Sequence, residues 1–200
     1  MPIAKFDIKE STCVPIQLEN IDTDQIIPAR FLSATSREGF GENLFRDWRY
    51  LKSGEKNMDF VLNNSLFNGK VLVAGKNFGS GSSREHAVWA VYDYGFRVVV
   101  SSFFADIFRN NALNNGLLPI VIPEELLKKL LNLIMNDPST KVGIDLEKQV
   151  FTVLPTGDCV NFEINAYKKE CLLKGLDDVD FLLSMKDQII GYEKNKNAAK

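Results

Sequence analysis

The 200-residue sequence lacks most of the features that assign a chain to a specialised class of protein. It contains one histidine and three cysteines, which lie far apart and form no Cys-x-x-Cys pair: Cys13, Cys159 and Cys171. A self-contained zinc or iron–sulfur site usually needs about four ligands, so neither such a site nor a disulfide framework is expected. Free, buried cysteines are the favoured interpretation.

Charge of one sign and long apolar runs are also absent. The formal net charge is −2, so no overall positive field favours nucleic acid or an anionic membrane. No apolar run approaches the roughly 20 residues that span a bilayer. The N-terminus has no apolar signal-peptide core and carries acidic residues early, at Asp7 and Glu10. We therefore expect a soluble, cytoplasmic protein.

What the chain does have is a globular composition, with 45% hydrophobic and 25% charged residues. Strand-like apolar runs alternate with helical patterns in its central part. Strands are expected at 70–75, 96–102 and 117–122, and helices at 83–94, at 103–116 and from Pro123, placed at the first helical position, onward. This alternation predicts a partly parallel, covered sheet. Residues 141–164 then predict two or three antiparallel strands, and residues 166–192 predict helices with a break near Gly175.

The first seventy residues are less regular. Weak alternation predicts one or two strands from Phe6 and Ile8 and from Val14 to Leu18. Residues 37–57 predict a short helix among loops. Its apolar face would be formed by Leu44, Phe45, Trp48 and Leu51. No repeat, linker or low-complexity segment divides the chain, so a single domain over residues 1–200 is expected.

The most distinctive stretch is NFGSGSSREHAVWA, residues 77–90. Three interpretations are open. The first is a capping box in which Ser82 caps the helix and Glu85 reaches back to it. On the residues alone this explains Ser82 best, but it leaves Gly79, Gly81 and Arg84 unexplained.

The second interpretation is an anion cradle, because a glycine-rich turn before a helix presents free amides and the positive end of the helix dipole. The phosphate-loop, dinucleotide and nucleophile-elbow patterns all fail. Arg84 stands where the dinucleotide pattern needs its third glycine, and Glu85 stands where the nucleophile elbow needs its second. A carboxylate or phosphate ligand is compatible with the sequence, whereas a P-loop enzyme or a serine hydrolase is not.

The third interpretation makes the loop half of an active site. Arg84 in a first helical turn opposes the helix dipole, and its planar guanidinium matches a carboxylate. A serine beside it has amides and positive potential nearby to stabilise an alkoxide. This arrangement suits removal of a proton next to a carboxylate.

At these residues the sequence resembles a known family. GSGSSREHA (79–87) and the stretch 95–122 resemble the swivelling domain of the aconitase family. NIDTDQIIPARFL (20–32) and GFGENLFRDWRYL (39–51) resemble the small subunits of its isopropylmalate dehydratase branch. The resemblance covers about residues 20–122. It implies an α/β fold of three β/β/α layers, with a mixed sheet, helices on one side and a C-terminal helical extension.

The resemblance also implies a hydro-lyase that converts 2-isopropylmalate to 3-isopropylmalate by dehydration and rehydration in leucine biosynthesis. Ser82 resembles the catalytic base, Ser83 and Arg84 resemble substrate-carboxylate binders, and Asp24 resembles an active-site aspartate. Arg30 resembles a second substrate arginine. The implied 4Fe-4S cluster belongs to a large subunit, so this chain itself binds no metal or cofactor and is active only in a heterodimer or higher assembly. Its ligand is a small dicarboxylate, with no nucleic acid or membrane partner.

Alternatives accompany each of these expectations. A related dehydratase for citraconate, methylmalate or homoaconitate would use similar chemistry, because one methylene gives only about 1–3 kcal/mol of discrimination. A non-catalytic carboxylate-binding module would use the same helix N-terminus. Asp24 is otherwise a turn cap and Arg30 a solvated arginine, while His86 is expected to be packed. An apolar pocket or the core would take Phe31, Leu32, Phe40 and Phe45.

Overall fold

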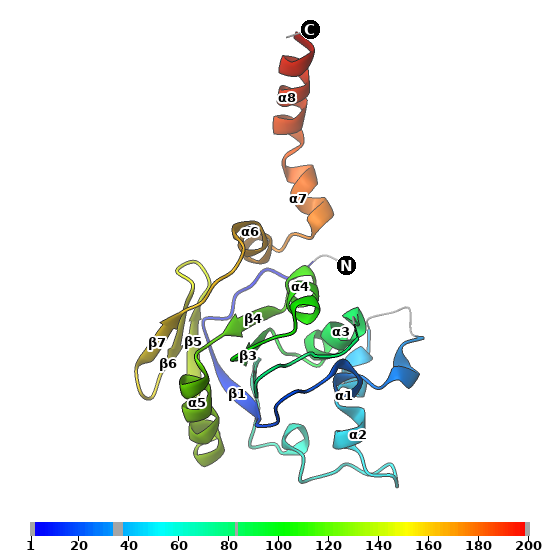
Figure 1. Cartoon of the computed structure of the whole chain (residues 1–200), viewed down its shortest axis with the longest axis vertical. Helices are drawn as coiled ribbons and strands as arrows, with labels where there is room; N and C mark the ends of the chain where they lie inside the picture. Colours follow the sequence, from blue (N-terminus) through cyan, green and yellow to red (C-terminus); the bar gives the residue numbers. More distant parts are fainter. Residues whose placement is uncertain (1–2, 34–37, 83, 199–200) are drawn as a thin grey trace.

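The computed structural model describes residues 3–33, 38–82 and 84–198 (Figure 1). These residues form a seven-stranded sheet in the order β4-β3-β2-β1-β5-β6-β7. The strands are β1 (Glu10–Ile16), β2 (Val71–Ala74), β3 (Val98–Ser101), β4 (Leu118–Val121), β5 (Lys141–Asp145), β6 (Val150–Val153) and β7 (Asp158–Asn161).

The sheet is mixed, as expected. Strands β1 to β4 pair in parallel, whereas β5 is antiparallel to β1 and continues into the antiparallel strands β6 and β7. Every residue of β2 and β3 is buried, which is typical of parallel strands covered on both faces. In β5 the buried residues alternate with less buried ones. The burial pattern therefore distinguishes the two halves of the sheet: β2 and β3 are buried throughout, whereas burial alternates along β5.

Helices and the antiparallel half of the sheet cover the two faces of the parallel half. Helices α3 (Glu85–Asp93) and α4 (Asp106–Asn114) pack on one face, over Leu72, Ala74 and Val99. On the other face, Val71, Val73 and Val98 share a core with β5, β6 and the apolar side of α5 (Glu124–Asn136). The result is the expected three-layer α/β arrangement, with α5 closing the inner core (Figure 1).

The segment between β1 and β2 is irregular, as expected. It contains α1 (Thr23–Ile26), η1 (Ala29–Phe31), η2 (Phe40–Asn43), α2 (Arg46–Arg49) and η3 (Val61–Asn63). The expected single helix is therefore wrong: η2 and α2 are separate turns on either side of Phe45, whose φ is +47°. Leu44 and Phe45 are buried, but Leu51 is 50% exposed and belongs to no apolar face.

Two sets of contacts accompany the break between η2 and α2. The buried guanidinium of Arg49 donates from Nη1 to the carbonyls of Gly41, Glu42 and Leu44 at 3.2–3.3 Å. The N–H of Phe45 donates to the Ile26 carbonyl at 2.8 Å, so it does not continue a helix from η2. These contacts, and not the apolar spacing, shape the segment.

The N-terminal segment contacts α6 (Ala166–Lys174). Phe6 donates its main-chain N–H to the Leu172 carbonyl at 2.9 Å, so the first residues lie outside the sheet and the strand expected around Phe6 and Ile8 is absent from the described residues. Gly175, with φ +71°, ends α6 at the expected break. Beyond it α7 (Asp178–Ser184) and α8 (Lys186–Ala198) project away from the sheet (Figure 1). Across the described ranges, no helix has the length and apolar character to cross a membrane.

Candidate functional site

The loops that follow β1, β2 and β3 meet at the carboxyl ends of these parallel strands. Main-chain N–H groups of Gly79 and Ser80 donate to the Ile21 carbonyl at 2.8 and 3.2 Å, and the N–H of Thr23 donates to the Ser80 carbonyl at 2.9 Å. A further bridge pairs Phe78 with Phe104 of the third loop. This edge of a parallel sheet is where open α/β folds place their ligands.

Two glycines allow the central loop to take this path. Gly79 has φ +78°, and a Cβ there would lie 2.3 Å from Cγ of Phe108 in α4. Gly81 has φ +87°, a left-handed conformation that side chains rarely adopt. The glycines that a capping box leaves unexplained are therefore needed to place the loop against α4 and α1.

The loop brings together two of the expected site residues. Arg84 Nη1 forms an ion pair with Asp24 Oδ1, and the Arg84 side chain is 17% exposed while that of Asp24 is 54% exposed. The ion pair with Asp24 therefore orients the Arg84 guanidinium.

The expected capping box is wrong. The helix begins at Glu85, and its N-cap is Arg84, in an extended conformation and without a side-chain cap. Residues 79–82 instead lie beside residues 21–23, and the Thr23 hydroxyl donates to the Ser82 carbonyl at 3.0 Å. Tertiary contacts have overridden the local capping preference. The Ser82 side chain is exposed at the mouth of α3 and is not used as a cap.

Glu85 and His86 contact neighbouring side chains. Glu85 Oε1 accepts a hydrogen bond at 2.9 Å from Asn115, which also accepts one from the Trp89 indole at 3.1 Å. The His86 ring lies 4.5 Å from the Trp89 ring and 5.6 Å from that of Phe40. His86 is thus packed in an aromatic cluster, and Glu85 binds Asn115.

Arg30 lies in another group of side chains. It donates from Nη1 to Asp47 Oδ2 at 3.1 Å and also contacts Oδ1, which makes the pair bidentate. This hydrogen bonding raises the pKa of Arg30 and lowers the pKa of Asp47. Arg30 is 55% exposed and makes no contact with the Asp24–Arg84 pair among the described residues. Ser83 lies outside the described residues.

The aromatic residues expected near a substrate divide into two sets. Phe40 and Phe45 are 3% and 0% exposed and belong to the core around α3. Phe31 and Leu32 pack against that core only partly. Of the four, only Phe31 and Leu32 keep exposed surface.

The described residues do not fit a metal ion or an iron–sulfur cluster. They contain no group of three or more His, Cys, Asp or Glu side chains that is arranged to hold one. Cys13 and Cys171 are buried, and only Cys159 is exposed. Burial raises the pKa of the Cys13 thiol to about 12, so it is not a thiolate at neutral pH.

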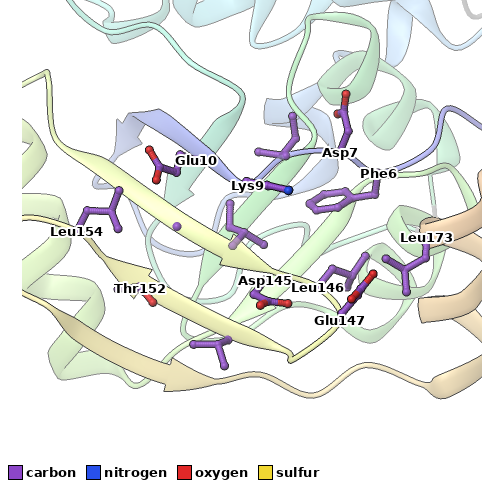
Figure 2. Close-up of a pocket in the computed structure, with 14 residues that line it drawn as sticks. Phe6, Asp7, Lys9, Glu10, Asp145, Leu146, Glu147, Thr152, Leu154 and Leu173 are labelled. Carbon is purple, nitrogen blue, oxygen red and sulfur yellow. The ribbon is translucent and has the colours of Figure 1, made fainter.

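The cavity in Figure 2 lies away from this site. It has a volume of about 450 Å³ and is formed by residues 6–10 and the facing parts of β5 and β6. Asp7, Lys9, Glu10 and Asp145 are among its lining residues. It lies at the amino end of β1, whereas Asp24 and Ser82 follow the carboxyl ends of β1 and β2. The candidate site is the exposed surface around Ser82.

Three residues that support the site were given no role in the sequence analysis. Asp22 and Gln25 form a reciprocal capping box that starts α1, and an Asp-x-x-Gln spacing signals it. Asn115, 30 residues from Glu85, has no local sequence signal. The capping role considered for Asp24 is thus performed by Asp22.

The fold and the loop define a class of protein that comparison makes explicit. Residues 3–125 match the family model of the aconitase C-terminal domain, and the chain belongs to that family. A 3-isopropylmalate dehydratase small subunit of Azobacteroides pseudotrichonymphae is 58% identical over 192 residues, covering 96% of this chain and 98% of that protein. Within the class, therefore, the chain belongs to the family of 3-isopropylmalate dehydratase small subunits.

Further relatives support the same placement over nearly the full length. The small subunit of Cytophaga hutchinsonii is 56% identical over 190 residues, covering 95% of this chain and 94% of that protein. A crystal structure of 3-isopropylmalate dehydratase from Methanocaldococcus jannaschii matches with a TM-score of 0.66 and 29% identity, covering 94% of this chain and 99% of that one. The expected family and fold are confirmed.

Proposed function

We propose that the chain is the small subunit of a hydro-lyase that isomerises 2-isopropylmalate to 3-isopropylmalate in leucine biosynthesis. The near full-length relatives support the reaction. The observation that carries the proposal is the exposed Ser82 in the loop before α3, two residues ahead of Arg84, whose guanidinium is held by Asp24. A pure anion site needs the arginine and the helix N-terminus but has no use for a particular hydroxyl.

Ser82 is the proposed base. As an alkoxide it takes the proton from the carbon next to a substrate carboxylate, the electron pair left behind forms the C=C bond, and the hydroxyl leaves the neighbouring carbon. Rehydration reverses these steps with the hydroxyl on the other carbon. Main-chain N–H groups at the start of α3 and the adjacent Arg84 supply the positive potential that favours the alkoxide.

Arg84, Ser83 and Arg30 are the proposed carboxylate binders. Arg84 has its guanidinium oriented by an ion pair with Asp24. Arg30 would exchange its bidentate partner Asp47 for a substrate carboxylate, since both present the same pair of acceptor oxygens. The two arginines would then hold the two ends of a dicarboxylate.

The rest of the active site is proposed to come from a large subunit in a heterodimer or higher assembly. A 4Fe-4S cluster carried by that subunit would act as a Lewis acid on the leaving hydroxyl. The open position of Ser82 and the absence of a metal-ligand group among residues 3–33, 38–82 and 84–198 support this division. Three free cysteines are compatible with a reducing compartment, and we place the enzyme in the cytoplasm, with no nucleic acid or membrane partner.

The proposal is tested by reconstitution. The chain and its large subunit are purified anaerobically and supplied with iron and sulfide. Formation of the unsaturated acid is then followed by absorbance on adding 3-isopropylmalate, with citraconate, aconitate and homoaconitate assayed in parallel. We expect turnover only when both proteins are present, with isopropylmalate preferred. If another acid were preferred, that acid would replace isopropylmalate as the proposed substrate. No turnover of any of these acids by an assembled complex with an intact cluster would contradict the proposal.

A further inference from the structure

Thr23 is a buried polar residue between the proposed site residues. It is 2% exposed and directly precedes Asp24 in α1. Buried hydroxyls are normally hydrogen-bonded, and Thr23 Oγ1 donates to the main-chain carbonyl of Ser82 at 3.0 Å. The two residues are 59 positions apart, so the bond belongs to the tertiary structure of the site and not to a local turn.

Thr23 binds the Ser82 loop on both sides of Gly81. Its main-chain N–H donates to the Ser80 carbonyl at 2.9 Å, and its hydroxyl donates to the carbonyl of Ser82. Gly81, with φ +87°, is the most conformationally free type of residue and lies between these anchors. Without the side-chain bond, the Ser82 carbonyl loses the contact that fixes the orientation of the Ser82 main chain, and with it the direction of the Ser82 side chain.

We infer that Thr23 is a positioning residue for Ser82. Its hydroxyl holds the Ser82 main chain so that the side-chain oxygen keeps one position relative to the Asp24–Arg84 pair. Thr23 itself touches no reacting atom. The inference rests on the proposed function, because it assigns Thr23 a role in turnover only if Ser82 is the base.

The test compares three substitutions in the reconstituted complex. Thr23→Val removes the hydroxyl at nearly constant shape, and Thr23→Ser retains it. The control is Thr140→Val, since Thr140 is also 2% exposed and its hydroxyl contacts a carbonyl, that of Leu133, at 3.5 Å. Both kcat and KM for 3-isopropylmalate are measured, together with the thermal midpoint of each small subunit.

We expect Thr23→Val to lower kcat by about 10- to 100-fold, because a misplacement of about 1 Å at a reacting group has an effect of this size. KM should change by less than about three-fold, since Arg84 is still present. Thr23→Ser should stay within about three-fold of the wild-type kcat, and Thr140→Val should leave kcat unchanged. If Thr23→Val does not assemble, Thr23→Ala carries the same expectation.

Two results would overturn the inference: a kcat for Thr23→Val within three-fold of wild type, or a Thr23→Ser variant as impaired as Thr23→Val. Failure of the proposed function is recognised separately. In that case the wild-type complex is inactive, or Ser82→Ala measured alongside keeps its turnover.

Discussion

The Asp24–Arg84 ion pair has a matched counterpart at the other end of the molecule. Its side chains are 54% and 17% exposed, and those of Asp178 and Lys168 are 57% and 18% exposed. We predict that Asp24→Asn lowers kcat/KM at least about 10-fold, because Arg84 loses the charge that orients it, whereas Asp178→Asn has no effect. Each change should alter stability by at most about 1 kcal/mol, as for other exposed pairs.

Steady-state kinetics of the reconstituted complex and urea unfolding of the small subunit check this prediction. An unchanged kcat/KM for Asp24→Asn would remove Asp24 from the site. An equal loss from Asp178→Asn would mean that the assay reports general damage to the fold.

Cys13 gives a pH-dependent prediction. Burial raises its pKa to about 12, above the value of about 8.5 in an unfolded chain. The folded state therefore keeps a proton that the unfolded state loses, so stability is retained below pH 8.5 and falls between pH 8.5 and 12. We predict that the wild type loses roughly 1 kcal/mol more stability per pH unit in this window than Cys13→Ala does.

Urea unfolding at pH 7, 9 and 10.5 checks the slope. Cys159→Ala is the control, because it makes the same substitution at an exposed cysteine. Equal slopes for the wild type and Cys13→Ala would show that the Cys13 thiol titrates in the folded protein as it does in the unfolded chain.

At the residue scale, the sequence predicts which side chains are candidates for the chemistry but not how they are held. The structure brings two of these candidates together, Asp24 and Arg84. The Ser82–Glu85 capping box was a sound local inference that failed, because Thr23 and Ile21 bind the loop in an extended form. Such partners lie more than fifty residues away and leave no local pattern.

At the scale of elements, the Gly79 turn sets where α4 meets the loop, and a second glycine serves as its control. Gly157 has φ +74° with nothing within 4 Å of an added Cβ, whereas at Gly79 (φ +78°) a Cβ would lie 2.3 Å from Phe108. Gly157→Ala should cost about 1 kcal/mol of stability from backbone strain alone. We predict that Gly79→Ala costs about 1–3 kcal/mol more, because it must also displace the Phe108 ring.

Denaturant unfolding of the two variants measures the difference, and turnover of the complex shows whether the displaced loop still serves Ser82. Equal free-energy costs would mean that α4 and the loop separate freely, and that their contact does not fix the site.

Element prediction succeeded where the signal is local. The strands and helices between residues 70 and 136 follow from buried apolar runs, helical spacing and terminal glycines, with boundaries shifted by one to three residues. Pro123, for example, is the N-cap of α5 and not its first residue. The stretch 37–57 failed as one helix because Arg49 and Phe45 make the contacts described above, which periodicity does not encode.

At the scale of the whole molecule, the proposed single domain with a helical extension makes α8 dispensable for folding. Among the residues of α7 and α8, Val179, Leu182 and Leu183 are 58–64% exposed, and Tyr192 is 67% exposed. We predict that ending the chain after Ser184 lowers the thermal midpoint by less than about 4 °C, equivalent to about 1 kcal/mol. Ending it after Asn165 removes the buried Cys171 and Leu172 and should lower the midpoint much further.

Circular dichroism of the two truncated chains checks this division. A large fall in the thermal midpoint on removing α8 alone would show that the extension belongs to the folded core.

The central claim is that this chain contributes the base to an active site completed by another subunit. The most direct test is turnover of 3-isopropylmalate by the reconstituted complex carrying Ser82→Ala, beside Ser80→Ala from the same loop, with assembly followed by size-exclusion chromatography. We predict intact assembly for both, a loss of about 10²- to 10⁴-fold in kcat for Ser82→Ala, and a kcat within about three-fold of wild type for Ser80→Ala. Near-normal turnover by an assembled Ser82→Ala complex would contradict the account.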